Sequence, residues 1–241
     1  MIAPRDHAAW LQGDAAVCRI LPARLGAPRR IVLLGPPGIG KGTQAGLLSA
    51  ALGACALATS EIIHGLFPPP ALNRRLPADT LLELIRARSH CLTCPAGFIL
   101  DGFPRTVAHA EALDHLLQNN DCSLDAVILY ELPVSLIVLR LLGRRVCPTC
   151  QKTYHVKARP PRITGYCDDC QTMLTQQRED RLDAMRLMQG THPSHSPRLL
   201  GYYQSRGLLV KISAHGTTEE IFMRTIDTFK MTRSGDHYAA R

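Results

Sequence analysis

The sequence lacks several features that would assign it to a class at once. No apolar run approaches the ~18 residues that a membrane-spanning helix needs. There are no internal repeats, low-complexity tracts or secretory signal. We therefore expect a cytoplasmic protein with no membrane partner.

Serine and threonine are absent from residues 1–28, which contain Asp6 and Asp14. Transit peptides are rich in serine and poor in acidic residues. We interpret residues 1–28 as an N-terminal extension of another kind.

The chain has 241 residues, enough for one α/β core with an inserted lobe. Hydrophobic residues make up 46% of it, an ordinary share for a globular protein. The net charge of +8 suits polyanionic ligands, but nucleotides and nucleic acids both fit this description. Charge alone does not choose between them.

Nine cysteines, an odd number without a secretory signal, favour reduced thiols and a metal site over disulfides. Cys147 and Cys150 form one C-x-x-C pair, and after sixteen residues Cys167 and Cys170 form a second. This spacing is typical of a tetrahedral Cys₄ zinc site, which is structural because no ligand position remains for water. The lone pair Cys91 and Cys94 is expected in a loop without a metal.

A glycine-rich stretch lies between an apolar run, Ile31–Leu34, and a predicted helix, Thr43–Leu52. A strand, a glycine turn and a helix N-terminus bring backbone N–H groups and a positive dipole end to one phosphate. Lys41 adds a point charge on the β- and γ-phosphates. The predicted phosphate-binding residues are Gly35, Gly38, Ile39, Gly40, Lys41, Gly42 and Thr43.

Four further strands are predicted at 54–59, 98–101, 126–131 and 208–213. Asp101 ends the second of these beside the phosphate loop, where a carboxylate can hold the water shell of a nucleotide-bound Mg²⁺. Pro133 should open a helix as its first residue. Arg140 and Arg144, four residues apart, would share one face of that helix.

Four blocks of the sequence together resemble the nucleoside monophosphate kinases, and most closely the adenylate kinase family. The first is G-P-P-G-x-G-K-G-T, from Gly35 to Thr43. The others are Gly97–Thr106, then Gly143-Arg144-Arg145 with Tyr154-His155, and then Gly201-Tyr202-Tyr203. They occur in the family's order and cover roughly residues 30 to 230.

The resemblance implies how the donor, ATP·Mg, is bound. Arg140 would lie against the adenine and Arg144 on the phosphates. Gly216 falls where family members offer a backbone carbonyl to the adenine. A lid with a zinc site is a known variant of this family, and it would close over the nucleotides to exclude water.

The resemblance also implies an acceptor site for AMP. Arg105 would grip the acceptor phosphate with its guanidinium fork. The sequence departs from the family pattern at His64, which replaces an arginine, and at His109, which replaces a glutamine that reads adenine. The acceptor lobe is also shorter than usual. The predicted AMP-binding residues are Thr59, His64, Leu76, Gly102, Arg105 and His109.

A further departure concerns the arginines that surround the transferred phosphate. Arg178 can serve as the first of them if one residue is dropped from the alignment. Met188 stands where the second is expected, and Arg186 and Arg181 lie two and seven residues before it. We expect Lys41, Arg105, Arg144 and Arg178 to form the cationic cage, with Asp101 positioning magnesium.

The expected fold is α/β, a doubly wound five-stranded parallel sheet with helices on both faces and two inserted lobes. The core would comprise residues 29–59, 80–144 and 178–230. The shortened acceptor lobe would comprise residues 60–79, the zinc lid 145–177 and a frayed tail 231–241.

The predicted reaction is reversible transfer of the γ-phosphoryl group of ATP to AMP by a monomeric enzyme, with Mg²⁺ as cofactor and zinc as a structural ion. Two alternatives stay open: a kinase for another nucleoside monophosphate, and a catalytically weakened relative that binds ATP and zinc. A zinc-ribbon nucleic-acid binder would have no use for the block Asp101–Thr106, which argues against that third alternative.

Overall fold

The computed structural model describes residues 29–66, 78–150, 152–190 and 196–231. The expected N-terminal extension, much of the acceptor lobe and most of the tail lie outside the described residues. So do Leu76 and the side chain of His64, two of the predicted AMP-binding residues.

The chain divides into two compact units. The first contains residues up to Leu34, Lys41–Tyr130 and the chain from Ser196 onward. The second contains Gly35–Gly40 and Glu131–His195. The lid boundaries expected from the sequence, 145–177, stay a prediction.

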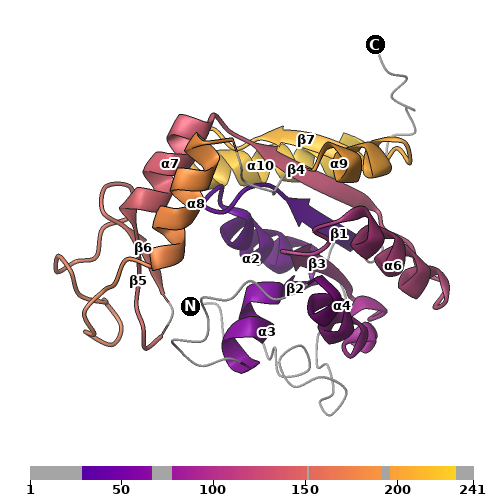
Figure 1. Ribbon diagram of the computed structural model, residues 1–241, viewed down its shortest axis with the longest axis horizontal. Helices are drawn as coiled ribbons and strands as arrows, with labels where there is room; N and C mark the ends of the chain where they lie inside the picture. Colours follow the sequence, from indigo (N-terminus) through magenta and orange to yellow (C-terminus); the bar gives the residue numbers. More distant parts are fainter. Residues whose placement is uncertain (1–28, 67–77, 151, 191–195, 232–241) are drawn as a thin grey trace. The chain divides into compact units, whose positions relative to one another are not determined.

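A five-stranded parallel sheet forms the centre of the first unit, in the order β2-β3-β1-β4-β7 (Figure 1). Val32 on the central strand pairs with Leu100 on one side and Val127 on the other, and all three are fully buried. Such continuous apolar runs are expected of strands covered on both faces. The strands are β1 (Arg29–Leu34), β2 (Cys55–Ala58), β3 (Gly97–Asp101), β4 (Ala126–Glu131) and β7 (Leu209–Ser213).

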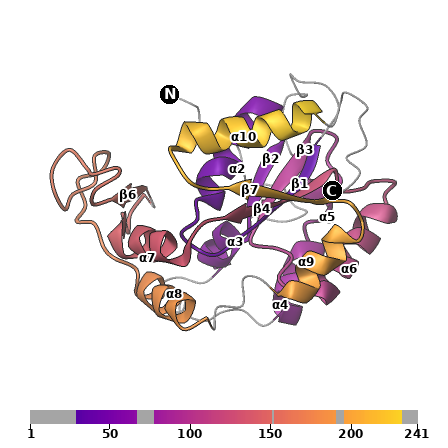
Figure 2. The same cartoon turned by 90° about the horizontal axis from the view of Figure 1, so that it is seen from above.

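Helices cover both faces of this sheet, which confirms the doubly wound fold. Figure 2 shows α2 and α10 on one side of the sheet and α4, α6 and α9 on the other, and α2 packs against α10. The helices of this unit are α2 (Lys41–Leu52), α3 (Thr59–Leu66), α4 (Ala78–Arg86), α5 (Ser89–Leu92), α6 (Val107–Gln118), α9 (Pro197–Gln204) and α10 (Thr218–Met231).

Thr217 caps α10 through two hydrogen bonds with Glu220. Its hydroxyl oxygen accepts from the amide of Glu220, and the Glu220 carboxylate accepts from the amide of Thr217. This reciprocal pair satisfies two donors that the helix end would otherwise leave unpaired.

In the described part of the second unit, the helices are α7 (Val134–Gly143) and α8 (Arg178–Met188), and β5 (Arg144–Val146) forms a hairpin with β6 (Thr153–His155). The helices pack together, and the buried residues of α8 are Asp180, Ala184 and Leu187. These positions recur at i, i+4 and i+7, so they form one face.

Three local expectations need correction. Pro133 is the N-cap of α7 rather than its first residue, because its extended ψ of 136° keeps it outside the helix. Arg144 does not share a helix face with Arg140, because α7 ends at Gly143 and Arg144 begins β5. Cys91 lies in the short helix α5 rather than in a loop.

Within the described residues, no helix has both the length and the apolar character that a membrane crossing requires.

Candidate active site and zinc centre

Lys41 and Asp101 lie together at the carboxyl edge of the sheet. Lys41 is the first residue of α2, and Asp101 is the last residue of β3. Their Nζ and Oδ1 atoms are 3.9 Å apart, and each side chain is 16% exposed. Because β1 and β3 are parallel and pair Leu33 with Asp101, the loop that follows β1 and the end of β3 share one edge. A cation and a carboxylate therefore face each other where the phosphate loop ends.

Burial dominates the electrostatics of Asp101. Loss of solvent raises the pKa of its carboxyl above the usual 3.8, while the charges of Lys41 and Arg105 pull the pKa down. A carboxylate that holds the water shell of Mg²⁺ must be ionised. The two cations reduce the cost of ionising this buried acid.

The phosphate loop depends on glycine for its backbone. Gly38 and Gly40 have φ angles of 78° and 107°, a region that side chains with a Cβ rarely adopt. A Cβ on Gly38 would lie 2.6 Å from Cγ of Leu141, which leaves no room for it. Arg140, expected against the donor adenine, donates from Nη1 to the carbonyl of Ile39 at 3.0 Å. This contact ties α7 to the loop.

Gly35 also has a positive φ, of 141°, at the start of the loop. Gly42 and Thr43 are exposed in the first turn of α2, where backbone N–H groups have no partner within the helix. Such a helix start is a suitable place for a phosphate.

On the acceptor side, the position of Gly102 has no room for a side chain. Its φ is 88°, and a Cβ there would collide with Oγ1 of Thr59, a buried residue. Arg105 is exposed and donates from Nε to the Gly102 carbonyl at 2.9 Å. The three predicted residues Thr59, Gly102 and Arg105 are therefore brought together by the ends of β2 and β3.

His109 is buried in the fold, with 3% of its surface exposed. Its ring stacks on Phe103, with centroids 4.8 Å apart, and its Nδ1 accepts from the amide of Arg105 at 3.3 Å. Its own amide donates to the Thr106 hydroxyl that caps α6. The ring therefore supports the turn that carries Arg105, and its predicted contact with the acceptor base stays a prediction.

Arg144 is held by a buried acid that the sequence analysis did not select. Its Nε donates to Oδ2 of Asp180 at 2.8 Å, and its Nη2 pairs with the other carboxylate oxygen. Nη2 is also 3.3 Å from Oε1 of Gln177. Asp180 is 1% exposed, and burial raises its pKa while the Arg144 guanidinium lowers it. This two-pronged pair fixes the orientation of Arg144.

Around α8, the remaining candidate cations point in different directions. Arg178 is exposed and lies two residues from Asp180, about 200° around the helix. Arg181 donates to the side chain of Gln176 at 3.0 Å, and Arg186 pairs with Asp183 at 3.3 Å. Met188 is 61% exposed. The place of Arg178 in the cationic cage stays a prediction.

Gly216 lies in an exposed loop that two side chains of α10 shape. Its φ is 103°, and a Cβ there would collide with the Glu220 carboxylate. Arg224 donates to the carbonyls of Ser213 and His215 in the same loop.

The four predicted zinc ligands come together in the second unit. The Sγ atoms of Cys147, Cys150, Cys167 and Cys170 all lie within 4.8 Å of one another. Those of Cys147 and Cys170 are 3.3 Å apart, and those of Cys150 and Cys167 are 3.5 Å apart. Four sulfurs at ~2.3 Å from one tetrahedral zinc would be separated by roughly 3.8 Å. The cluster fits this ion.

Two loops of the same design carry these cysteines. The amide of Cys147 donates to the carbonyl of Lys152 at 3.0 Å, and the amide of Cys167 donates to that of Thr172 at 2.9 Å. Both partners lie five residues further along. A hydrogen bond from Tyr154 lowers the pKa of the Cys167 thiol to about 6, which favours the thiolate that a metal requires.

Comparison with known proteins identifies the family. A family model described as adenylate kinase matches residues 73–208. An adenylate kinase of Clostridium kluyveri is 34% identical over 206 residues, which cover 81% of this chain and 95% of the relative. Those of Clostridium novyi and Clostridium botulinum are 34% and 33% identical over 204 residues, which cover 80% of this chain and 94% of each relative.

The chain belongs to the adenylate kinase family. This confirms the resemblance seen in the sequence, and it makes the protein a phosphotransferase. The Cys₄ cluster supports the zinc-lid type within the family.

Asp180 is the member of this adenylate kinase site that sequence reasoning passed over. Glu179 and Asp180 follow Arg178 in the first turn of α8, and neither was assigned a role from the sequence. The position of Asp180 was the signal that could have identified it. Asp180 comes four residues before Ala184 and seven before Leu187, which places the acid on the buried face of α8.

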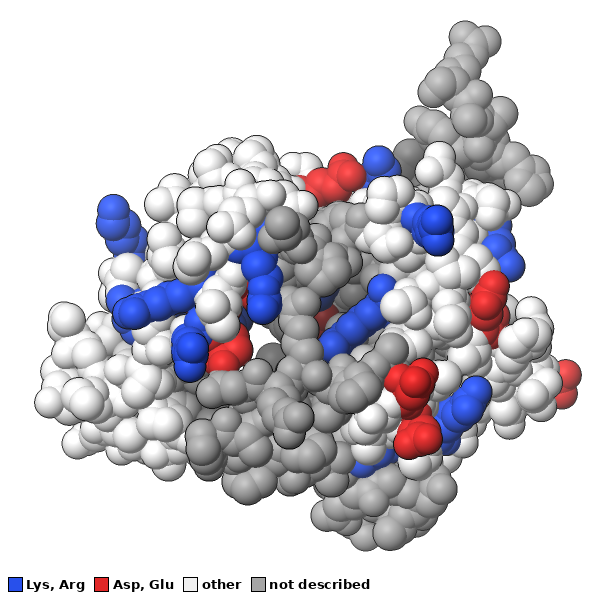
Figure 3. Space-filling view, in the orientation of Figure 1, with Lys and Arg blue, Asp and Glu red and all other residues white. Residues whose placement is uncertain are grey.

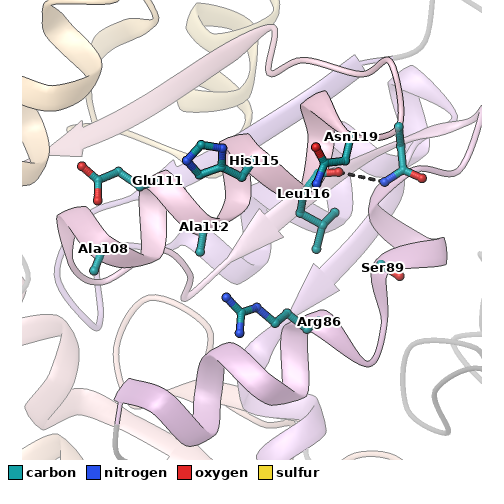
Figure 4. Close-up of a pocket in the computed structure, with 9 residues that line it drawn as sticks. Arg86, Ser89, Ala108, Glu111, Ala112, His115, Leu116 and Asn119 are labelled. Atoms are coloured by element: carbon teal, nitrogen blue, oxygen red, sulfur yellow. Dashed lines mark hydrogen bonds between the residues drawn. The ribbon is translucent and has the colours of Figure 1, made fainter.

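A pocket of about 560 Å³ also lies between α4 and α6, away from the predicted site residues (Figure 4). Arg86 extends from α4 beneath Ala112 of α6. None of the predicted nucleotide-binding or catalytic residues within the described part of the chain lines this pocket.

Asp101→Asn should stabilise the protein in the absence of nucleotide at pH 7.5. The raised pKa of Asp101 means that its contribution to stability is present in acid and is lost as the pH rises through the folded-state value. Asparagine does not titrate, so the advantage of the variant should shrink as the pH is lowered. Thermal unfolding at pH 7.5 and 4.5 measures both effects. A variant less stable than the original protein at pH 7.5 would contradict the raised pKa of Asp101.

The protein should be purified with about one equivalent of zinc. Cys150→Ser removes one of four ligands and should abolish tight binding, whereas Cys122→Ser, outside the cluster, should leave it intact. Elemental analysis of protein prepared without chelator measures the content. Retention of zinc by Cys150→Ser would refute a Cys₄ site.

Proposed function

We propose that this protein transfers the γ-phosphoryl group of ATP·Mg to AMP, giving two molecules of ADP. The observation that carries this proposal is the approach of Lys41 to Asp101 at the end of the phosphate loop. Membership of the adenylate kinase family, and the names of the relatives, support it.

The chain's own groups suggest how the reaction proceeds. Phosphoryl transfer needs little covalent help, so the protein contributes alignment and positive charge. Lys41 and the N–H groups at the start of α2 bind the donor phosphates. Magnesium, held through water by Asp101, would neutralise charge on these phosphates. Arg105 binds the acceptor phosphate.

Arg144 supplies a third cation, whose orientation is fixed by its partners. Asp180 and Gln177 use its Nε and Nη2 hydrogens. Within the described part of the chain, no residue forms a hydrogen bond with Nη1. The Nη1 hydrogens therefore remain for a phosphate, and the Asp180 carboxylate holds the guanidinium in its orientation.

Acceptor selection is the feature in which this enzyme should differ from the family pattern. His109 replaces the residue that reads adenine, and its ring is buried against Phe103 with Nδ1 already hydrogen-bonded. This favours, as a second candidate, a kinase that accepts other nucleoside monophosphates. Rates with ATP and AMP, CMP, UMP or GMP separate the two candidates.

Three further expectations from the sequence stay predictions: the structural role of zinc, the monomeric state and the cytoplasmic location. Nucleic-acid binding has less support. Figure 3 shows the described Lys and Arg side chains of one face in small separate groups, with Asp and Glu among them, rather than as one continuous stripe.

Lys41→Ala should reduce AMP-dependent ADP formation by about 10²-fold or more, because it removes a preorganised charge from the donor phosphates. A coupled assay for ADP measures the rate. Lys211→Ala, an exposed lysine on β7, is the matched control and should retain full activity. Near-normal turnover by Lys41→Ala would show that this loop does not bind the donor.

Met188→Arg should raise kcat, because one missing cation in a phosphoryl-transfer cage can cost about 10³-fold. Arg181 and Arg186 already have polar partners on or beside α8, so we expect a slow enzyme with ordinary affinity for ATP. The kcat values of the original protein, Met188→Arg, Arg181→Ala and Arg186→Ala measure this. A fast original enzyme, disabled by loss of Arg181 or Arg186 and unaffected by Met188→Arg, would contradict the prediction.

A further inference from the structure

Tyr154 is among the largest fully buried side chains of the described residues, yet it lies in a segment with almost no apolar core. It is 2% exposed and packs with Cys147, Cys167 and Leu174. It comes from the middle of β6, where it pairs with Arg145 of β5. A buried tyrosine hydroxyl needs polar partners, and both of its partners belong to the second cysteine loop.

The direction of these hydrogen bonds follows from the donors available. The amide of Asp168 donates to the Tyr154 hydroxyl oxygen at 2.8 Å. That amide cannot accept, so the hydroxyl proton must be directed elsewhere. The Sγ atom of Cys167 lies 3.4 Å from the same oxygen. When zinc binds, Cys167 is a thiolate without a proton, so in that state the tyrosine is the donor and the cysteine sulfur the acceptor.

Zinc binding makes this acceptor negatively charged. Four thiolates and one Zn²⁺ ion carry a net charge of about −2. Cys167 is 2% exposed, so water is largely excluded from its sulfur. A buried charge without hydrogen-bond donors is costly, and the hydroxyl is placed to supply one, beside the backbone amides of Asp169 and Cys170. The Lys152 ammonium adds positive charge nearby, 5.9 Å from the tyrosine ring centre.

We propose that Tyr154 is a positioning residue of the zinc centre, which orients the Cys167 thiolate by a hydrogen bond from its hydroxyl and thereby sets how tightly the metal is retained. The same residue links the metal to the β5–β6 hairpin. That hairpin begins at Arg144, so the metal and this cation share one small element. The proposal does not depend on the phosphoryl-transfer reaction.

Tyr154→Phe in the full-length protein tests this proposal, because phenylalanine preserves the ring and removes only the hydroxyl. Zinc transfer to a competing chelator should show affinity reduced about 10- to 100-fold, the usual effect of removing a hydrogen-bond partner of a metal ligand. Tyr166→Phe is the matched control. Tyr166 directly precedes Cys167 in the chain, but it is 47% exposed, and its substitution should leave zinc affinity unchanged.

Substitution of Co²⁺ for zinc separates the hydrogen bond from simple packing. Loss of a hydrogen bond raises the energy of the sulfur lone pairs, so the thiolate-to-cobalt charge-transfer band of Tyr154→Phe should move to longer wavelength. Leu174→Ala loosens the same cluster without touching a sulfur, and its band should not move.

The proposal is supported if Tyr154→Phe binds zinc more weakly and its cobalt band lies at longer wavelength, while the band of Leu174→Ala does not move. Zinc affinity and a cobalt band equal to those of Tyr166→Phe would overturn it. Weakened binding in both Tyr154→Phe and Leu174→Ala, with neither band shifted, would also overturn it, because packing alone would then explain the effect.

Discussion

Parallel pairing of β1 with β3 is the constraint on which the candidate active site depends. It aligns Leu33 with Asp101, so the chain leaves β1 into the phosphate loop at the edge where β3 presents its terminal carboxylate. The loop then returns as α2, whose first residue, Lys41, faces that carboxylate. Because both strands are buried, the pair is partly removed from water. The same burial that strengthens the attraction also raises the pKa of the acid.

The pair of Arg144 and Asp180 shows the same balance between charge attraction and the cost of burying an acid. Asp180 accepts from Nε and Nη2 of Arg144, which orients the guanidinium and offsets part of its charge, while Gln177 accepts from Nη2. The carboxylate is almost fully buried, and its pKa is raised for that reason. An oriented cation is useful to phosphoryl transfer. That Met188, exposed at the end of α8, leaves this arrangement with one cation fewer than the family pattern stays a prediction.

The zinc centre solves a different problem, the lack of apolar residues between the two C-x-x-C pairs. The small core there consists of Cys147, Tyr154 and Cys167, with Leu174 against it. Such a core cannot balance the conformational entropy of the surrounding loops. Metal binding supplies folding free energy directly, about 10 kcal/mol or more for structural zinc. A bound zinc ion would therefore take the place of a hydrophobic core in this segment.

The sequence by itself determined the fold class, the phosphate loop and the zinc ligands. Each of these depends on local spacing. A strand, glycines and a helix start in succession mark the phosphate loop, and paired cysteines mark the zinc ligands. The sequence did not show that Arg144 leaves α7, nor that Asp180 holds it. It also did not show that His109 turns into the core beneath Phe103. These features depend on which elements pack together and on which polar groups lose water, and only the tertiary structure decides that.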